Sequence, residues 1–509
     1  MNRYFIGIDS GTTSIKAVLF DEKCNEIDKK AFPLTGIFPR ENQYEEDMGE
    51  IWEKLCLCVC SITAKYGKDG IWGIGITAQG DGLWLVDGKG EPVRNGCCFC
   101  DGRSENVVDE WVRNGTADKL FKITGTRIFT GNQNSIVKWM SQNDAQSLDK
   151  AKYFLHLKDY LFYKLTGEFI TESTDQSLVL IDLEKREYSK EAFEICGIAQ
   201  YRSKYPPLKK TNEARSIIQK SVAEKLGLSE KTVVTSGPMD VVACALASGA
   251  IKSGECCSII GTAALHEMVI SEPKWGGANC GMTVTHIEES RWLRLMASLA
   301  GTPNIEWMLE VFGKQIKTGA AGQNMNVYNY IEKLISEVPV GANGVMYHPY
   351  LLAGGERAPF TDSRARASYT GLGIKHTIAD IARATYEGVA YAMFDCYQSM
   401  PQEVKSVAIC GGGARSALWC QMFADVLGIE VKTIKGEEFG AKGAAMNNMV
   451  IQGVYPDYKT AVEKTVMTDR RFTPDAEKHR EYMKYYKLFK RSREVFAELW
   501  KMRAELIER

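Results

Sequence analysis

The sequence has no excess of charge of either sign and no long apolar run. Its 63 Lys and Arg residues balance 64 Asp and Glu residues, which gives a formal net charge of −1. Proteins that bind nucleic acids or membrane surfaces usually carry a basic excess, so we expect neither partner. No uncharged apolar stretch reaches the ~18 residues that a membrane-spanning helix needs. Residues 1–20 also lack the pattern of a signal peptide, so these absences together predict a cytoplasmic protein.

Proline and recognisable metal-ligand patterns are also scarce. Only 14 of the 509 residues are proline, which argues against long disordered segments. The 15 cysteines do not form the paired arrangement of a structural zinc site. We interpret them as buried free thiols in a reducing compartment. Glycine, in contrast, is abundant, and its 46 residues indicate tight turns and close approach of the backbone to ligands.

Hydrophobic periodicity predicts a mixed α/β chain. A β-meander is expected first, and the predicted strands are 4–9, 15–20, 26–32, 71–77, 83–86, 91–93, 233–237, 256–260, 265–270, 345–352 and 404–409. Residues 87–90 have the composition of a hairpin turn. Helical spacing predicts helices at 47–66, 104–113, 135–142, 158–166, 214–226, 239–250, 378–400, 417–427, 437–453 and 475–507.

Two features of this pattern concern the organisation of the chain. The strand, Gly-Thr turn and strand at 256–270 faintly repeat those at 4–20, so an internal duplication is left open. The last helix, 475–507, is amphipathic, and we interpret it as a helix that packs on a domain and exposes a solvated face. A membrane-associated or partner-binding helix is the alternative.

Three glycine-rich turns each follow a predicted strand. They contain Gly11, Thr12 and Thr13; Gly261 and Thr262; and Gly412, Gly413, Ala414 and Ser416. Backbone N–H groups and hydroxyls in such turns can hold phosphate oxygens, so the three turns favour nucleotide binding. The chain has no GxxxxGK[ST] loop and no GxSxG nucleophile elbow. Gly73 and Gly75 mimic a dinucleotide fingerprint, but they lie within a strand that a hairpin follows.

Two carboxylates and one lysine lie next to these turns. Asp9 ends the first strand, and Asp240 follows Gly237-Pro238-Met239 at the start of a predicted helix. A carboxylate at that position either acts as a general base toward a substrate hydroxyl or only interacts with the helix dipole. Lys16 either offsets phosphate charge or is a solvated strand residue.

Several motifs together resemble those of the FGGY carbohydrate kinases, in the actin-like ATPase superfamily. Residues 8–17 are similar to the first phosphate motif of that family, and residues 367–387 fit its C-terminal signature at every fixed position. Residues 411–416, with Trp419 and Asp425, resemble its adenosine motif, and residues 237–240 resemble its catalytic aspartate motif. Residues 135–139 match the N-terminal signature only approximately.

The resemblance implies an α/β fold of two actin-like (ribonuclease H-like) domains with a cleft between them. The first domain, residues 1–247, would bind the sugar, and the second, residues 248–509 with the long C-terminal helix, would bind ATP. Asp240 would accept the proton of the substrate hydroxyl, and Asp9 would hold Mg²⁺. Contacts to ATP are implied for Gly11, Thr12, Thr13, Lys16, Gly261, Thr262, Gly412, Gly413, Ala414 and Ser416.

The segment that contacts the sugar in this family departs from two of its branches. Glycerol kinases carry Gln-Arg-Glu there and D-xylulose kinases carry Met-His, whereas this chain has Gln79-Gly80-Asp81-Gly82. The segment is more similar to that of the erythritol kinase and L-xylulose (3-keto-L-gulonate) kinase branch. The implied substrate contacts are Gln79, Gly80, Asp81, Asp101, Arg103, Asn132 and Asp240.

We therefore predict an ATP-dependent kinase that phosphorylates a terminal hydroxyl of a four- or five-carbon polyol or ketose. A D-xylulose or glycerol kinase is the alternative within the family, and a non-kinase actin-like ATPase is the alternative outside it. The presence of both Asp9 and Asp240 disfavours a catalytically inactive sugar-binding regulator. The oligomeric state is left open, with a homodimer among the arrangements.

Overall fold

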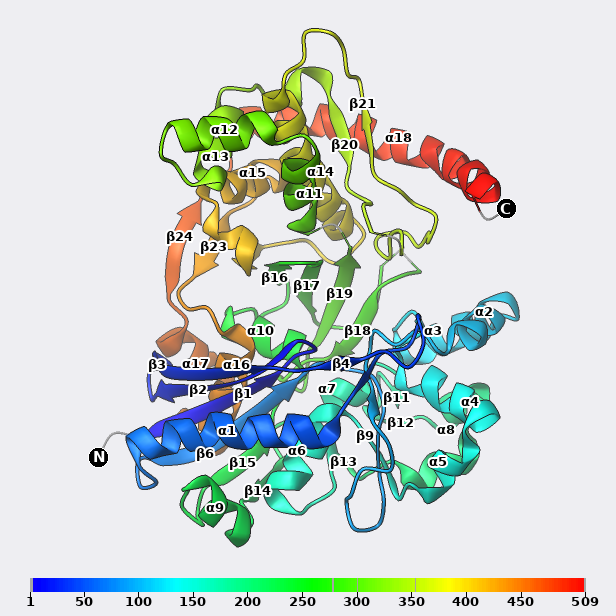
Figure 1. Ribbon diagram of the computed structural model, residues 1–509, viewed down its shortest axis with the longest axis vertical. Helices are drawn as coiled ribbons and strands as arrows, with labels where there is room; N and C mark the ends of the chain where they lie inside the picture. Colours follow the sequence, from blue (N-terminus) through cyan, green and yellow to red (C-terminus); the bar gives the residue numbers. More distant parts are fainter. Residues whose placement is uncertain (1–2, 277–278, 300, 353, 508–509) are drawn as a thin grey trace.

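A computed structural model describes residues 3–276, 279–299, 301–352 and 354–507. The chain forms two α/β lobes along the long axis of the molecule, each built around one large mixed sheet (Figure 1). The first sheet has the strand order β14-β15-β6-β1-β2-β3. Its strands are β1 (Tyr4–Ser10), β2 (Ser14–Asp21), β3 (Glu26–Pro33), β6 (Ile71–Ala78), β14 (Arg215–Ile217) and β15 (Val233–Ser236).

The second sheet has the order β18-β19-β17-β16-β22-β23-β24. Its strands are β16 (Glu255–Ile260), β17 (Ala264–Ile270), β18 (Met282–Thr285), β19 (Trp292–Ser298), β22 (Ser406–Cys410), β23 (Val431–Ile434) and β24 (Thr468–Phe472). The short strands elsewhere are β4 (Gly36–Ile37), β5 (Glu45–Glu46), β7 (Trp84–Val86), β8 (Gly96–Cys97), β9 (Tyr153–Leu155), β10 (Thr171–Glu172), β11 (Ile181–Asp182), β12 (Glu187–Tyr188), β13 (Leu208–Lys209), β20 (Met346–His348) and β21 (Ser368–Thr370).

The helices cover both faces of the two sheets. α1 and α6 cover one face of the first sheet, and α10 and α16 cover the other. The helices are α1 (Met48–Tyr66), α2 (Glu105–Arg113), α3 (Thr116–Thr124), α4 (Gln133–Asn143), α5 (Ala145–Lys150), α6 (Leu157–Thr166), α7 (Ser173–Gln176), α8 (Lys190–Ile195), α9 (Lys220–Leu226), α10 (Asp240–Ala247), α11 (Pro303–Val311), α12 (Lys314–Gly322), α13 (Val327–Ser336), α14 (Ile378–Gln398), α15 (Ala417–Leu427), α16 (Phe439–Ile451), α17 (Tyr458–Thr465) and α18 (Ala476–Ile507).

The two sheets repeat one arrangement of strands. In the first, β1 pairs antiparallel with β2 and parallel with β6, and the sheet continues with parallel β15 and antiparallel β14. In the second, β16 pairs antiparallel with β17 and parallel with β22, followed by parallel β23 and antiparallel β24. The same order and directions in both sheets are what an internal duplication produces, so the faint repeat in the sequence has a structural counterpart.

α16 joins the two lobes, because it follows β23 of the second sheet yet packs on β1 and β6 of the first. Glycines allow this close approach. A Cβ atom on Gly7 would lie 2.0 Å from the Ala441 carbonyl oxygen, and one on Gly75 would lie 2.0 Å from that of Ala444. The glycines of β6 therefore make room for a helix, which explains why their resemblance to a dinucleotide fingerprint is misleading.

One predicted helix was wrong in detail, and one predicted hairpin gains an additional partner strand. Residues 214–226 are not one helix, because Arg215–Ile217 forms β14 at the edge of the sheet and α9 begins only at Lys220. The turn at 87–90 does form, with Asp87 N–H donating to Glu91 O at 2.9 Å. Val86 pairs antiparallel with Pro92, and Val93 N–H donates to Leu85 O at 2.9 Å, so the predicted hairpin forms, while β7 also pairs with β9 at 153–155. At residues 215–217, pairing with β15 overrides the helix-like local pattern.

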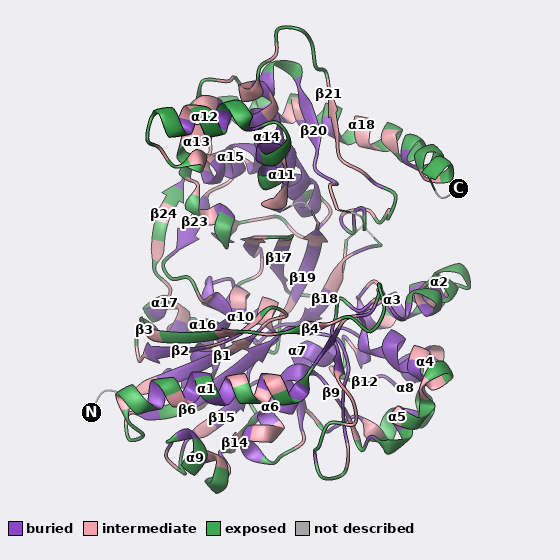
Figure 2. Ribbon diagram, viewed as in Figure 1, coloured by how far each residue is buried: buried purple, intermediate pink, exposed green. Residues whose placement is uncertain are grey.

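The C-terminal helix α18 packs on the second domain through Tyr482, Tyr486, Phe489 and Trp500. Figure 2 shows its outer end exposed, whereas the two sheets are mostly buried. Within the described ranges, no helix is long and apolar enough to cross a membrane. The interpretation of a domain-packed helix with one solvated face therefore agrees with the structure.

Candidate active site

The second and third glycine-rich turns lie against each other in the second domain. The N–H of Thr302 donates to Gly261 O at 2.7 Å, which fixes the β16–β17 turn. Gly411 has a φ of 81°, and a Cβ atom on it would lie 2.7 Å from Ile260 O. Only glycine allows this conformation and this contact without strain, so the sequence of the third turn is set by its packing on the second.

A cavity of about 630 Å³ opens beside these turns. Gly412 and Gly413 form part of its lining, and the rings of Tyr328, Tyr386 and Trp419 contribute apolar surface; its remaining lining residues are Thr302, Ile305, Glu306, Asn326, Asn329, Glu332, Arg415 and Ser416. The Ser416 hydroxyl already accepts a hydrogen bond from Trp419 N–H at 3.0 Å and caps α15. Ala414 is not among the lining residues, and its carbonyl oxygen accepts a hydrogen bond from Arg470.

Asp9 and Asp240 are the two half-buried carboxylates of the first domain next to the first turn. None of the described residues donates a hydrogen bond to Asp9, whose pKa burial raises to about 6 although Lys16 lowers it. Asp240 begins α10, and its pKa is raised to about 7, first by burial and then by the charge of Asp9. The charge of Asp9 therefore acts on Asp240, and burial raises the pKa of both carboxyl groups above its usual range.

Lys16 is not a free cation. Its ammonium lies 2.9 Å from a carboxylate oxygen of Glu438, just before α16. The pairing ties β2 of the first domain to the second domain, and a Cβ atom on Gly440 would lie only 2.7 Å from Asp9 Oδ2. The start of α16 thus lies directly against the first turn.

Gln79 links the first turn to a buried acidic residue. Thr12 Oγ1 donates to Gln79 Oε1 at 3.0 Å, and Gln79 Nε2 donates to Glu46 Oε2 at 2.8 Å. Burial raises the pKa of Glu46 to about 7, and its Oε1 atom has no hydrogen-bond partner. Thr13, in contrast, is exposed.

Asp81 and Asn132, two of the implied substrate contacts, lie side by side. Asn132 Nδ2 donates to Asp81 Oδ2 at 2.8 Å, and Gln133 N–H donates to Asp81 Oδ1 at 3.3 Å. Asp81 adopts a left-handed φ of 59°, and burial raises its pKa to about 7. Gly80 lies against the residue that precedes the candidate base, because a Cβ atom on it would be 2.2 Å from Met239 Sδ.

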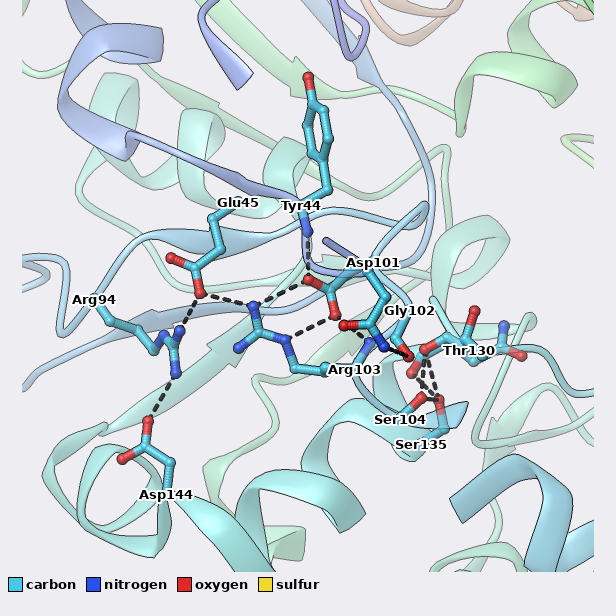
Figure 3. A network of polar contacts seen from close by, with 12 residues as sticks. Tyr44, Glu45, Arg94, Asp101, Gly102, Arg103, Ser104, Thr130, Ser135 and Asp144 are labelled. Atoms are coloured by element: carbon cyan, nitrogen blue, oxygen red, sulfur yellow. Dashed lines mark hydrogen bonds and ion pairs between the residues drawn. The ribbon is translucent and has the colours of Figure 1, made fainter. Parts of the chain in front are cut away.

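Asp101 and Arg103 belong to a separate network (Figure 3). Arg103 Nε donates to Asp101 Oδ1 at 2.7 Å, and Arg103 Nη2 lies 2.7 Å from Glu45 Oε1. Asp101 Oδ2 also accepts a hydrogen bond from Tyr44 N–H at 2.7 Å. These side chains are almost fully buried, and their hydrogen bonds hold residues 44–46 in place.

The most informative residue that the sequence analysis missed is Asp175 of α7. It is fully buried, and neither carboxylate oxygen accepts a hydrogen bond. The Lys158 ammonium lies 3.1 Å from one oxygen, within a cluster that also contains Asp159 and Glu172. A Cβ atom on Gly80 would lie 3.3 Å from Asp175 Oδ1, and the negative charge of Asp175 raises the pKa values of both Asp81 and Asp240.

The signal for Asp175 in the sequence is weak but visible. Residues 171–177 form an unbroken run of polar residues, which reads as a solvated loop, yet all of them are buried. Buried polar groups need partners, and unpartnered ones mark strain or a ligand. No group of three or more His, Cys, Asp or Glu residues in the described part of the chain is arranged to hold a metal ion by itself.

Comparison with known proteins agrees with this geometry. The model of the N-terminal domain of the FGGY family of carbohydrate kinases matches residues 4–247, and that of the C-terminal domain matches residues 256–451. The chain therefore belongs to the FGGY family of carbohydrate kinases and is a phosphotransferase. The resemblance found in the motifs and the enzyme class that it implied are confirmed.

Curated relatives align over almost the whole chain. The L-xylulose/3-keto-L-gulonate kinase of Escherichia coli K12 is 27% identical over 495 residues, which is 96% of each protein. The erythritol kinase of Brucella abortus is 26% identical over 504 residues, 97% of this chain and 96% of the relative. A xylulose kinase of Staphylococcus epidermidis is 27% identical over 512 residues, 97% of this chain and 98% of the relative.

Solved structures confirm the two-domain actin-like fold. A ligand-bound xylulose kinase from Lactobacillus acidophilus superposes with a TM-score of 0.90 at 21% identity and covers 98% of this chain and 99% of that one. A Plasmodium falciparum glycerol kinase with ADP gives a TM-score of 0.83 at 20% identity, covering 96% and 98%. At such identities the likeness concerns the fold alone.

Proposed function

We propose that the protein is an ATP-dependent kinase that transfers the γ-phosphate to a terminal hydroxyl of a four- or five-carbon polyol or ketose. One observation carries this proposal: Asp240 begins α10 beside Asp9 and Asp175, whose charges raise its pKa, and Asp175 also lies against Gly80 and raises the pKa of Asp81. A base, a possible metal ligand and groups that accept hydrogen bonds from hydroxyls thus surround one place. We also infer that the sugar-binding domain spans residues 1–247 and the nucleotide-binding domain residues 248–509.

The role of Asp240 follows from its environment. A general base works best when its pKa lies near the working pH, and the pKa of Asp240 is raised to about 7. Its free carboxylate oxygen accepts the proton of the substrate hydroxyl, while Val241 N–H donates to Oδ1 at 2.7 Å and orients the group. Phosphoryl transfer depends mainly on alignment and neutralisation of charge, so the site needs little other chemistry.

The residues present fit ATP. The cavity beside Gly412 has a volume of about 630 Å³, with aromatic rings that suit a purine and glycines that let the backbone approach it. Thr12, Thr13 and Thr262 would donate hydrogen bonds to phosphate oxygens. The N–H groups of Gly11 and Gly261 instead donate to Ser14 O at 3.1 Å and to Ala263 O at 3.0 Å, so these two glycines would shape the turns. Ala414 and Ser416 would shape the adenosine pocket through the turn and the α15 cap, and Lys16 would act through its pairing with Glu438.

The residues also fit Mg²⁺. This ion is commonly bound through one or two carboxylates together with water and substrate phosphates. Asp9 offers one carboxylate to which no described residue donates a hydrogen bond. When bound, Mg²⁺ would neutralise part of the charge on the phosphates.

The substrate class follows from the buried acceptors. Carboxylates accept hydrogen bonds from hydroxyls, and Asp81 and Asp175 flank Gly80. Asn132 and Gln79 complete the polar surface, while Asp101 and Arg103 are assigned to positioning residues 44–46. The names of the erythritol and L-xylulose/3-keto-L-gulonate kinases support a polyhydroxylated chain longer than glycerol.

A panel of polyols and ketoses in a coupled assay of ADP release tests this proposal. We expect the best four- or five-carbon substrate to exceed glycerol at least tenfold in kcat/KM. The panel includes erythritol, L-xylulose, D-xylulose and glycerol, each with and without Mg²⁺. Glycerol as the best substrate would contradict the specificity, and ATP hydrolysis that no sugar stimulates would favour the non-kinase ATPase.

A further inference from the structure

A second cavity, which we call the junction cavity, lies where the two domains meet. Its volume is about 630 Å³. One wall comes from the β11–β12 hairpin and from residues 202–213 of the first domain, and the other from residues 286–289 between β18 and β19 of the second. It shares no lining residue with the cavity beside Gly412.

The lining of the junction cavity carries an excess of positive charge. Five cationic side chains face three carboxylates, Glu187, Glu213 and Glu289, which leaves a formal balance of +2. Two of the cations are already paired, since Lys210 lies 3.0 Å from Glu289 and Lys185 lies 2.8 Å from Asp182. The other three, Arg186, Arg202 and Lys209, have no carboxylate partner within the part of the chain that the structure describes.

The two arginines are held in place by aromatic rings. The guanidinium carbon of Arg202 lies 4.1 Å from the centroid of the Tyr188 ring, and that of Arg186 lies 4.6 Å from that of Trp292. Arg186 is half-buried, and burial lowers its pKa to about 10 because the charge of Glu289 compensates only in part. A fixed, planar guanidinium matches the geometry of a phosphate group, and its donors are oriented in advance.

A chain of hydrogen bonds connects this cavity to the candidate base. Thr211, in the lining, donates to Glu172 Oε2 at 2.7 Å. The other oxygen of Glu172 accepts a hydrogen bond from Thr174, whose Oγ1 accepts one from Met239 N–H at 2.8 Å. Met239 directly precedes Asp240, so a ligand that shifts Thr211 acts on the segment that carries the base.

We propose that the junction cavity binds a small phosphorylated metabolite with two or more negative charges, and that this binding alters phosphoryl transfer at Asp240. The three cations without a carboxylate partner supply the affinity for phosphate, and Arg186 is oriented further because it donates to Arg291 O at 2.5 Å. Because its walls come from both domains, a bound ligand also bridges the first domain and the β18–β19 hairpin. Contacts that differ between two domain arrangements shift the balance between them.

Calorimetric titration of 3-phosphoglycerate into the full-length protein, with the nucleotide site saturated by ADP and Mg²⁺, tests the binding. We expect one site per chain, with a Kd that rises at least tenfold in the double variant Arg202→Gln/Lys209→Gln. The control Arg480→Gln/Lys484→Gln removes the same charge from the exposed face of α18 and should leave the Kd unchanged. Because Arg202 packs on Tyr188, its substitution can destabilise the protein, so thermal unfolding of each variant is measured. If the double variant is unstable, the Kd of the single variant Lys209→Gln tests the proposal instead.

The proposal is overturned if the titration of the wild-type protein gives no saturable heat. It is also overturned if the control variant weakens binding of 3-phosphoglycerate as much as the double variant does. If the ligand binds, initial rates with the best sugar substrate test its effect on catalysis. We expect 3-phosphoglycerate to change kcat or the sugar KM at least twofold in the wild type and not in the variant. Binding without such a change would overturn the coupling to Asp240. The titration does not depend on kinase activity, so its outcome is separate from that of the proposed function.

Discussion

The turn between β1 and β2 and the turn between β16 and β17 are two copies of one structural element with different chemistry. In the first copy, Asp9 pairs across the strands with Lys16. At the corresponding place in the second copy, Ile259 pairs with Leu265. Both copies keep a glycine followed by threonine, Gly11-Thr12 and Gly261-Thr262, so the shape of the turn is retained while the charges are confined to the first domain.

The helices that follow the third parallel strand differ in the same way. α10 begins with Asp240, whereas α16, its counterpart after β23, begins with Phe439 and Gly440. Gly440 leaves space for Asp9, and α16 packs tightly on the first sheet. The two copies thus share a backbone arrangement, but Ile259 and Phe439 of the second stand where the first has the carboxylates of Asp9 and Asp240. This division is expected where one domain holds the reacting hydroxyl and the other the nucleotide.

Removing the base of the first copy should have the largest effect. We expect Asp240→Asn to lower kcat by roughly 10²–10⁴, the usual loss for a general base, while ATP and sugar still bind. Initial rates and calorimetric titrations measure the two quantities. Asp380→Asn is the matched control, because Asp380 also lies in the first turn of a helix, α14, where it caps the N-terminus. It should lower stability only, and near-normal turnover of Asp240→Asn would refute the assignment.

The acidic residues around Gly80 should control the substrate and not the nucleotide. Losing the Asp81 carboxylate leaves substrate hydroxyls unpaired in a buried site, which costs about 1–3 kcal/mol. We therefore expect Asp81→Ala to raise the sugar KM about 5- to 150-fold, with little change in the ATP KM. Asp81→Asn keeps a residue that tolerates the left-handed φ of 59° and so tests the charge alone. If Asp81→Asn is silent, the residue only shapes the turn.

The variant Asp175→Asn tests whether a second acidic residue beside Gly80, which the sequence analysis did not identify, also controls binding of the sugar. Asp175 Oδ1 lies beside Gly80 without a hydrogen-bond partner, whereas Oδ2 pairs with Lys158, so the variant should also raise the sugar KM, by about 5-fold or more. The Lys158 cluster would keep Asp159 and Glu172 as counter-charges. A sugar KM within twofold of the wild type, with a lowered unfolding temperature, would assign Asp175 to the structure of the cluster only.

The sequence allowed prediction of the parts of the site that are local in the chain. Asp9 and Asp240 lie at the ends of strands with glycine nearby, and such junctions are visible within a few residues. The glycine-rich turns are equally local, and together with the C-terminal signature at 367–387 they carry the family resemblance from which the fold and enzyme class were predicted. The edge strand β14 could not be predicted. Its own residues have helix-like spacing, and its strand structure results from pairing with β15.

Residues whose roles depend on distant partners were harder to assign. Asp175 lies 94 positions from Asp81 in the chain, and only the fold brings both of them to Gly80. Asp101 and Arg103 have the residue types of hydroxyl ligands, but they bond to each other and to residues 44–45. A sequence shows which side chains can form hydrogen bonds. Only the three-dimensional structure shows which of their donors and acceptors are already satisfied by other protein groups.

The proposed adenosine site of the second domain can be tested by substituting the glycines that line its cavity. A Cβ atom on Gly412 meets nothing closer than 3.9 Å, so Gly412→Val should fold and project into the cavity. We expect a rise of about fivefold or more in the ATP KM, equivalent to about 1 kcal/mol, and little change in the sugar KM. Gly413→Val is the contrasting variant, because its Cβ atom would lie 2.5 Å from Ile260 and destabilise the protein. An unchanged ATP KM in folded Gly412→Val would refute the position of the adenosine.

The smallest expected effect is the dependence of turnover on pH. Burial and the charge of Asp9 raise the pKa of Asp240 to about 7, so the carboxyl group gains a proton as the pH falls through that value. A protonated carboxyl cannot accept the proton of the hydroxyl, and kcat/KM for the sugar should fall about tenfold between pH 8 and pH 6. The matched control Asp380→Asn should show the same acidic limb, because Asp380 lies outside the site. A pH profile of kcat/KM that is flat from pH 8 to pH 6 would mean that the ionisation of Asp240 does not control the reaction. The carboxylates of the first copy would then not have the role proposed for them, and the contrast with the apolar pair Ile259 and Leu265 of the second copy would carry no functional meaning.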